Sequence, residues 1–490
     1  MKTRVICMLL SALFLAGALA SCTGGNTGDT TPAITTDAPI VTTEPVTTEY
    51  VESLEVPEDY FLDGYEFTIL CTSWMNNPPT PFNYKDTSLV LDEAIYRRNS
   101  IVEDEYGIII ATVEDYTTKG NSGVIRLQAN RTAGDTLYDA GVIAVFDTSK
   151  LAYQGFLSDM QEVPYVDLEK SWWDQNATAD ITIFGKTFYT TGDISFLDRE
   201  YTFATFFNKK IAAEQNLGDL YTIVRDGKWT VEVMSEMSKK VSADLNGDDK
   251  LDSNDKYGLI MWDDTLITMI NAAGKSLATL EDDVLTLTAN DAAAVEMVDK
   301  YMELCNDQSV INFQHTSGGV GWVEMYTNGQ ALFLIEYLKA LTTFRDTDLE
   351  YGILPMPKLN EDQDRYYCGL AGYQAGMYCI PADVHDEEAS GIITEALAYH
   401  SQKIVTPAYY DRTLIGRHVQ DPESEETLEI IFASRIYDLG LFYKVGGLNV
   451  RLNSMMASKN NQYASVIESY RRAIDKSLKD INTFFSSVAE

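Results

Sequence analysis

The sequence predicts an α/β fold in which helices flank mainly parallel sheets, with the chain divided between two domains. Segments with the alternation of a strand and segments with the periodicity of a helix follow one another along the chain. This order is typical of parallel sheets, whose strands are joined through helices. The part after residue 58 is roughly 430 residues long, which is more than one hydrophobic core usually supports.

The first domain opens with a strand–helix–strand–helix–strand pattern. We expect strands at Tyr65–Ser73, 108–115 and 138–146, and helices within 90–108 and 123–134. No glycine-rich phosphate loop follows these strands, so a dinucleotide-binding domain is not expected.

A second block begins near Tyr201 and repeats the alternation. Its strand-like and helix-like segments lie at 204–218, 228–241, 257–264, 291–305, 329–344 and 349–358. From residue 393 onward the chain is mostly helical.

The N-terminus has the form of an export signal. Basic residues precede an apolar run, 5–20, that is too short for a comfortable transmembrane helix. The run ends in Leu-Ala-Ser-Cys, which resembles the bacterial lipobox and implies that residues 1–22 are a lipoprotein signal peptide with a lipid anchor on Cys22. An ordinary secretory signal that happens to contain a cysteine is the alternative. Residues 23–58 are rich in Thr and Pro and predict a solvated, disordered tether.

The composition excludes some function classes. A formal charge of −37 repels nucleic acid, so no nucleic-acid partner is expected. The four histidines are isolated, and the zinc-protease, serine-hydrolase and Walker motifs are absent. We therefore expect no enzyme, although a chain with this many carboxylates leaves an exported glycoside hydrolase or lyase open as the alternative.

Four cysteines remain beyond the signal: Cys71, Cys305, Cys368 and Cys379. Their spacing supports neither a zinc ribbon nor a thioredoxin-like site. Cys368 and Cys379 could pair across a hairpin, and buried free thiols are equally compatible with the sequence.

An acidic loop, "DLNGDDKLDSND", has the ligand spacing of a calcium loop. The expected ligands are Asp244, Asn246, Asp248, the carbonyl of Lys250, Asp252 and Asp255. Asp249 stands at the sixth position, where such loops need a left-handed residue, and aspartate tolerates that conformation better than most residues. A single loop without a paired partner predicts a structural Ca²⁺ site rather than a sensor, and a solvated acidic turn is the alternative.

Several stretches together resemble the family 1 extracellular solute-binding proteins of ABC importers, in particular carbohydrate-binding lipoproteins. They include "LYDAGVIA", "GKTFYTTGDIS", "FFNKKIAAEQNL", "DGKWT", "ALFLIEYLKAL", "YGILPMPK" and "IFASRIYDLG". The resemblance implies a two-lobed periplasmic-binding-protein-like fold of the class II type, with the ligand cleft at the hinge. It implies lobes built from 59–195 with 359–406, and from 196–358 with 407–490. Crossings between the lobes are expected near 193–201, 355–359 and 403–409.

The family resemblance also implies a function and a site. We expect a monomeric receptor on the extracellular face of the cell membrane, anchored through Cys22, which binds a neutral oligosaccharide and delivers it to the permease subunits of an ABC transporter. Sugar binding needs flat apolar faces and polar groups at strand ends. The expected ligand contacts are Trp74, Asp193, Trp262, Trp322, Glu336, Tyr337 and Tyr373. The adjacent tryptophans 172 and 173 are expected to pack between the lobes or at the surface.

Overall fold

The two larger sheets of the molecule each form the centre of one lobe. The computed structural model describes residues 52–75, 80–117, 119–316, 319–344, 347–410 and 422–489. The described residues belong to one compact unit. The expected signal peptide, Cys22 and the expected tether as far as residue 51 lie outside the described residues.

The first sheet has the strand order β12-β3-β1-β2. Its strands are β1 (Tyr65–Ser73), β2 (Ile108–Tyr116), β3 (Ala140–Ala144) and β12 (Gly376–Cys379). The strand β1 runs parallel to both β2 and β3, whereas β12 is antiparallel to β3. The three strands expected in this domain are therefore confirmed, and the edge strand β12 comes from much later in the chain.

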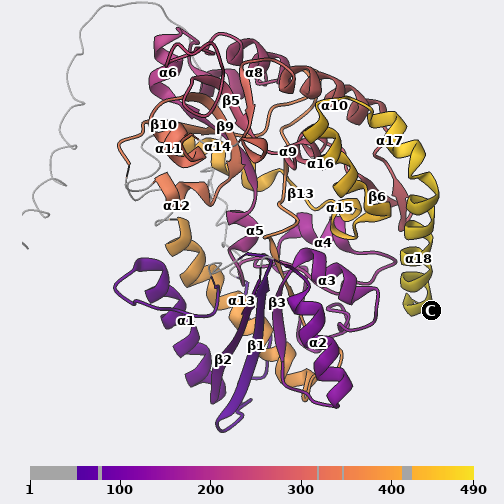
Figure 1. Cartoon of the computed structure of the whole chain (residues 1–490). Helices are drawn as coiled ribbons and strands as arrows, with labels where there is room; N and C mark the ends of the chain where they lie inside the picture. The colour runs from indigo at the N-terminus through magenta and orange to yellow at the C-terminus, as the bar shows by residue number, and fades with distance from the viewer. Residues whose placement is uncertain are drawn as a thin grey trace, which may run out of the picture. The chain divides into compact units, whose positions relative to one another are not determined.

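Helices cover this sheet. Those in contact with its strands include α1 (Val90–Tyr106), α2 (Ser122–Ala133) and α3 (Val145–Ala152). The long helix α13 (Glu387–Tyr410) packs against α1, and α4 (Gln175–Ile181) packs near Arg435 and Ile436. The guanidinium of Arg98 in α1 is fully buried and donates hydrogen bonds to Ser401 Oγ in α13 and to the Pro81 carbonyl, each at 2.6 Å. The bond to Ser401 joins α13 to α1, and the two helices lie side by side in Figure 1.

The second sheet has the strand order β10-β4-β9-β5-β8. Its strands are β4 (Phe203–Asn208), β5 (Tyr257–Met261), β8 (Val310–Asn312), β9 (Ala331–Tyr337) and β10 (Tyr351–Leu354). The strand β4 is antiparallel to both of its neighbours, and the other four run in one direction. The central strands are buried on both faces, as expected when helices cover a sheet from both sides.

The remaining elements surround this second sheet or follow it in the chain. The helices are α5 (Leu197–Glu200), α6 (Lys209–Glu214), α7 (Leu220–Arg225), α8 (Val231–Ser238), α9 (Thr265–Ala272), α10 (Ala292–Cys305), η1 (Phe313–His315), α11 (Trp322–Thr327), α12 (Ala340–Phe344), α14 (Pro422–Ala433), α15 (Leu439–Phe442), η3 (Val445–Gly447), α16 (Leu448–Ser458), α17 (Tyr463–Ser469) and α18 (Arg471–Ala489). Two small sheets pair β6 (Ala278–Glu281) with β7 (Val284–Leu287) and β11 (Cys368–Gly369) with β13 (Arg435–Ile436).

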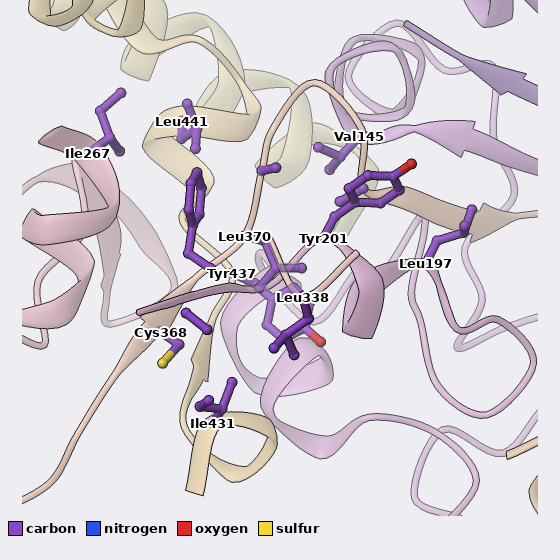
Figure 2. Packing of buried hydrophobic residues seen from close by; sticks show 14 of the residues in the cluster. Val145, Leu197, Tyr201, Ile267, Leu338, Cys368, Leu370, Ile431, Tyr437 and Leu441 are labelled. Atoms are coloured by element: carbon purple, nitrogen blue, oxygen red, sulfur yellow. The ribbon is translucent and has the colours of Figure 1, made fainter. Parts of the chain in front are cut away.

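Three chain segments meet between the lobes and form the hinge. The amide of Ala371 donates to the Tyr201 carbonyl at 3.0 Å, and β11 pairs with β13. Apolar side chains fill the space around them, and Tyr201 and Leu370 are at most 2% exposed. Figure 2 shows Leu370 and Leu338 close together in this region. The residue limits at which the chain passes from one lobe to the other remain a prediction.

The four cysteines of the described ranges are free and buried. Cys368 lies in the hinge strand β11, and Cys379 lies in β12 of the first sheet. Of the two alternatives for Cys368 and Cys379, the structure therefore has buried free thiols and not a disulfide. Across the described ranges, no helix combines the length and the apolar character needed to cross a membrane.

Candidate functional site

Trp74 follows the carboxyl end of β1 and forms the first-lobe side of the candidate site. Its indole N–H donates to Asp147 Oδ1 at 3.1 Å, and its ring meets the edge of Phe146 at a centroid distance of 5.5 Å. Phe146 and Asp147 follow β3, which is the neighbour of β1 in the sheet. Two adjacent parallel strands thus bring their terminal side chains together, as the carboxyl ends of parallel strands do.

Tyr373 reaches this cluster from the chain segment that follows the hinge strand β11. Its ring centroid lies 5.2 Å from that of Phe146 and 6.1 Å from that of Trp74. Neighbouring Gly372 permits this approach, since a Cβ there would lie 2.5 Å from the Phe146 ring. Tyr373 therefore joins the expected contact Trp74 in one aromatic surface.

Acidic and aromatic residues follow the strands of the second lobe. The Tyr337 hydroxyl, at the end of β9, donates to Asp264 Oδ2 at 3.1 Å. Burial raises the pKa of Asp264 to about 6. Burial, with the nearby Asp264 charge, raises the pKa of Glu336 to about 8. Because Glu336 holds its proton at neutral pH, it can donate a hydrogen bond to a ligand hydroxyl as well as accept one.

Trp262 and Trp322 pack against each other at the end of β5, with ring centroids 5.6 Å apart and nearly perpendicular. Asp263, the residue after Trp262, is buried and accepts hydrogen bonds from Asn312 Nδ2 at 2.7 Å and from His315 Nε2 at 2.8 Å. The Asp263 carboxylate therefore has its hydrogen-bond partners within the protein and stabilises the loop. The next residue, Asp264, lines the cleft.

A small cleft lies beside Tyr373 and Asp264, and Tyr373 is the one expected ligand contact in its lining. Its lining includes Phe203, Asp264, Thr268, Tyr373, Asn449 and Asn453. The cavity has a volume of about 20 Å³, which is room for about one water molecule. A larger ligand would fit only if the lobes or the lining side chains moved apart.

Asp193 lies apart from this cleft. Its Oδ1 accepts from Arg199 Nη2 and from the Thr406 hydroxyl, both at 2.8 Å. It lines a separate polar cavity of about 240 Å³ together with Trp172 and Trp173. The structure thus connects Asp193 with the hinge rather than with Trp74 and Tyr373.

Trp172 and Trp173 are buried, at 1% and 2% exposure. Both indole N–H groups donate to the carboxyl group of Glu395, at 2.8 and 3.1 Å. These residues form a buried polar cluster between α13 and the segment before α4, so the pair packs inside the protein and is not at its surface.

Sequence reasoning missed five residues at or beside the cleft: Phe146, Asp147, Lys444, Asn449 and Asn453. The sequence pattern predicts Phe146 as the last residue of a strand. Asn449 and Asn453 are four residues apart on α16, and this spacing places both amides on one face of a helix, a signal that could have been used. Lys444 carried no comparable local signal.

The acidic loop folds around its own carboxylates. Asp244 accepts the amide hydrogens of Gly247 and Asp249, at 2.6 and 2.9 Å. Asp255 is fully buried and accepts those of Leu245 and Asp252, at 2.8 and 2.9 Å. Asp249 has φ of 61°, so the expected left-handed residue at the sixth position is confirmed. No group of three or more acidic, histidine or cysteine side chains among the described residues stands ready to hold a metal, and Ca²⁺ binding stays a prediction.

Comparisons with known proteins place the fold. No family profile matches the chain, and no curated protein sequence matches it. Among solved structures, an ABC substrate-binding protein of Listeria monocytogenes in complex with cycloalternan matches with a TM-score of 0.55 at 14% identity, over 86% of this chain and 99% of that chain. The galacto-N-biose-/lacto-N-biose I-binding protein of the ABC transporter of Bifidobacterium longum matches with a TM-score of 0.57 at 10% identity, over 86% and 98%. A cyclic α-maltosyl-1,6-maltose-binding protein of Arthrobacter globiformis matches with a TM-score of 0.57 at 13% identity, over 85% and 100%.

These proteins agree with the architecture described above: sheets flanked by helices in two lobes that meet at a hinge. The chain has the two-lobed fold of the substrate-binding proteins of ABC transporters.

Proposed function

We propose that this protein is a carbohydrate receptor of an ABC importer, which binds a neutral oligosaccharide in the cleft between its lobes. The observation that carries this proposal is the aromatic surface formed by Trp74, Phe146 and Tyr373, next to the polar groups around Asp264. Sugar rings stack on flat aromatic faces, and their hydroxyls need closely placed donors and acceptors. Several proteins of the same fold are named for oligosaccharides that they bind.

Binding in this site couples to movement of the lobes. The aromatic surface is attached to strands of the first sheet, and Asp264 and Tyr337 follow strands of the second. A ligand that contacts both groups stabilises the closed arrangement, whereas a lobe alone offers half of the contacts. We infer that the closed, loaded form is the one that the permease subunits recognise.

The alternative is an exported enzyme that cleaves sugars with two carboxyl groups. Asp264 and Glu336 differ in pKa, about 6 against about 8, which is the kind of difference that an acid and a base require. The named structural neighbours are binding proteins, which supports the receptor. Recovery of the ligand after binding separates the two functions, because a receptor returns it intact.

The test is a thermal-shift screen of residues 52–490 against a panel of neutral oligosaccharides that includes maltotriose and lacto-N-biose. A ligand that binds only the folded state raises the melting temperature. For the sugar with the largest shift, we expect Tyr373→Ala to weaken binding by about 10-fold or more, since it removes a stacking face. Tyr96→Ala, a change at an exposed tyrosine of α1, is the control and should leave binding unchanged. A sugar recovered as fragments would establish the enzyme, and a panel without any binder would reject both functions for neutral sugars.

The proposal includes an anchored location. We propose that Cys22 carries the lipid that keeps the receptor at the extracellular face of the cell membrane, where tethering raises its effective concentration near the transporter. Cys22→Ser should release the protein into the medium. We further propose that the acidic loop beginning at Asp244 binds a structural Ca²⁺, for which its carboxylate and amide oxygens are the suitable ligand type.

A further inference from the structure

The ammonium group of Lys444 lies on the aromatic surface of the proposed sugar site. Its Nζ is 4.2 Å from the centroid of the Trp74 ring and 4.1 Å from that of Phe146. Both distances are well within the range of a cation–π contact, which is attractive because the faces of aromatic rings carry partial negative charge. A charged side chain of the protein therefore covers the faces on which a sugar ring would stack.

The rest of the Trp74 ring is covered by neighbouring groups. Gly120 packs so closely that a Cβ at its position would lie 2.4 Å from the indole. The indole N–H is bonded to Asp147, and the Phe146 ring meets the indole nearly edge to face. Among the described neighbours of Trp74, Lys444 is the one whose flexible side chain can move aside and leave a ring face for a sugar to stack on.

The backbone holds Lys444 in this position. Lys444 has φ of 50°, in the left-handed region that side chains with a Cβ seldom adopt. The preceding residue, Tyr443, is buried, and its ring packs against that of Tyr153 in the first lobe with centroids 6.1 Å apart. An anchored, left-handed backbone directs a long flexible side chain onto the aromatic surface.

Two charged groups of α3 face this ammonium. Asp147 is 1% exposed and favours the charged lysine, while Lys150 opposes it. Burial is the largest effect and lowers the pKa of Lys444 to about 8. The ammonium is therefore charged at neutral pH and loses its proton only slightly above it.

We propose that Lys444 is an internal occupant of the sugar-stacking surface, which a sugar ring has to displace before it can stack on Trp74. This inference rests on the proposed carbohydrate function. Lys444 then acts as a specificity-determining residue: sugars that present a broad apolar face displace it, and ligands that stack poorly do not. Above about pH 8 the neutral amine holds its position less firmly, so sugar affinity rises with pH there.

Two variants distinguish the effect of the positive charge of Lys444 from the effect of its side chain covering the Trp74 ring. Lys444→Met keeps a long side chain over Trp74 without the charge, and Lys444→Asn uncovers the ring with a residue that tolerates the left-handed backbone. Lys459→Asn is the matched control, since Lys459 is an exposed lysine with φ of 53° that lines a different cavity. Each variant is compared with its Trp74→Phe counterpart, so that the fluorescence difference reports Trp74 alone among the tryptophans.

The first readout needs no sugar. Acrylamide should quench Trp74 about 2-fold more strongly in Lys444→Asn than in the unsubstituted protein, because the ring is uncovered. Between about pH 6.5 and about pH 9.5 the Trp74 emission should change with a midpoint near 8, and this step should be absent in Lys444→Met. Equal quenching in Lys444→Asn, or a pH step that persists in Lys444→Met, would overturn the proposal.

The second readout is affinity for the panel sugar with the largest thermal shift. Lys444→Asn should bind it about 2- to 30-fold more tightly, which is the range that loss of one competing cation–π contact allows. Weaker binding would instead identify Lys444 as a direct sugar contact and refute displacement. A panel without any binder would reject the receptor function, and displacement with it, while the acrylamide result would still report whether the lysine covers Trp74.

Discussion

Glu395 accepts hydrogen bonds from two buried indole N–H groups, and its replacement tests how much this buried cluster near the hinge contributes to stability. Replacing it by alanine leaves the N–H groups of Trp172 and Trp173 without their acceptor. A buried donor without a partner costs about 1–3 kcal/mol. Since both tryptophans are nearly inaccessible to water, Glu395→Ala should lower the free energy of unfolding by about 2–6 kcal/mol.

Glu395→Gln removes only part of this stabilisation. The amide keeps one oxygen as acceptor and presents a donor to the second indole, so it should cost about 1–3 kcal/mol. Urea denaturation below pH 4.5, where the Glu395 carboxyl is protonated in the folded and the unfolded state, measures both variants. Glu388→Ala on the same helix is an exposed control. If Glu395→Ala lowered the free energy of unfolding by less than about 0.5 kcal/mol, the buried cluster would not contribute as the structure implies.

The same carboxyl group makes stability depend on pH. Burial raises the pKa of Glu395 in the folded protein to about 8, from an ordinary value of 4.5. Between these values the folded state holds a proton that the unfolded chain has released, so the contribution to stability falls as pH rises through this window. Glu395→Gln has no proton to lose, and its stability should vary less across the window. A difference in the opposite direction would mean that the two indoles keep the carboxylate ionised.

Three further predictions concern other parts of the molecule. Arg435→Met should lower stability by about 3–5 kcal/mol in thermal unfolding, because it removes the cation that pairs with the largely inaccessible carboxylates of Asp174 and Asp198; an unchanged melting temperature would contradict this. Asp244→Ala should abolish the rise in melting temperature that Ca²⁺ gives and leave sugar specificity intact, whereas a loss of sugar binding would make the metal functional rather than structural. Dithiothreitol should not shift the melting temperature, since Cys379 and the other cysteines of the described ranges are free thiols, and a clear fall would reveal a disulfide.

The sequence predicted best what short-range periodicity encodes. The strand Tyr65–Ser73 was placed without error, and the aromatic residue after it, Trp74, lies on the aromatic surface of the site. The end of a buried parallel strand is a local signal, because the next residue has to emerge at the ligand edge of the sheet. The same argument found the stretch around Trp262, although the carboxylate facing the cleft is that of Asp264.

Strand direction and long-range contacts could not be predicted from short-range periodicity. The alternation of buried and exposed residues does not record which way a strand runs, so the antiparallel placement of β4 and β12 was not expected. Lys444 belongs to a turn among C-terminal helices, and its contact with Trp74 joins residues far apart in the chain. Asp193 was expected in the cleft because it lies near a crossing, and proximity to the hinge also explains its pairing with Arg199.

The origin of β12 has a consequence for the order in which the protein folds. A chain that emerges from its N-terminus makes β1, β2 and β3 early, but the strand that completes this sheet follows the whole of the second one. Until β12 arrives, the edge of β3 presents unpaired backbone groups that could pair with another chain. The first lobe therefore cannot mature before the second has been synthesised, and a chain truncated ahead of Gly376 should aggregate rather than yield an independent lobe.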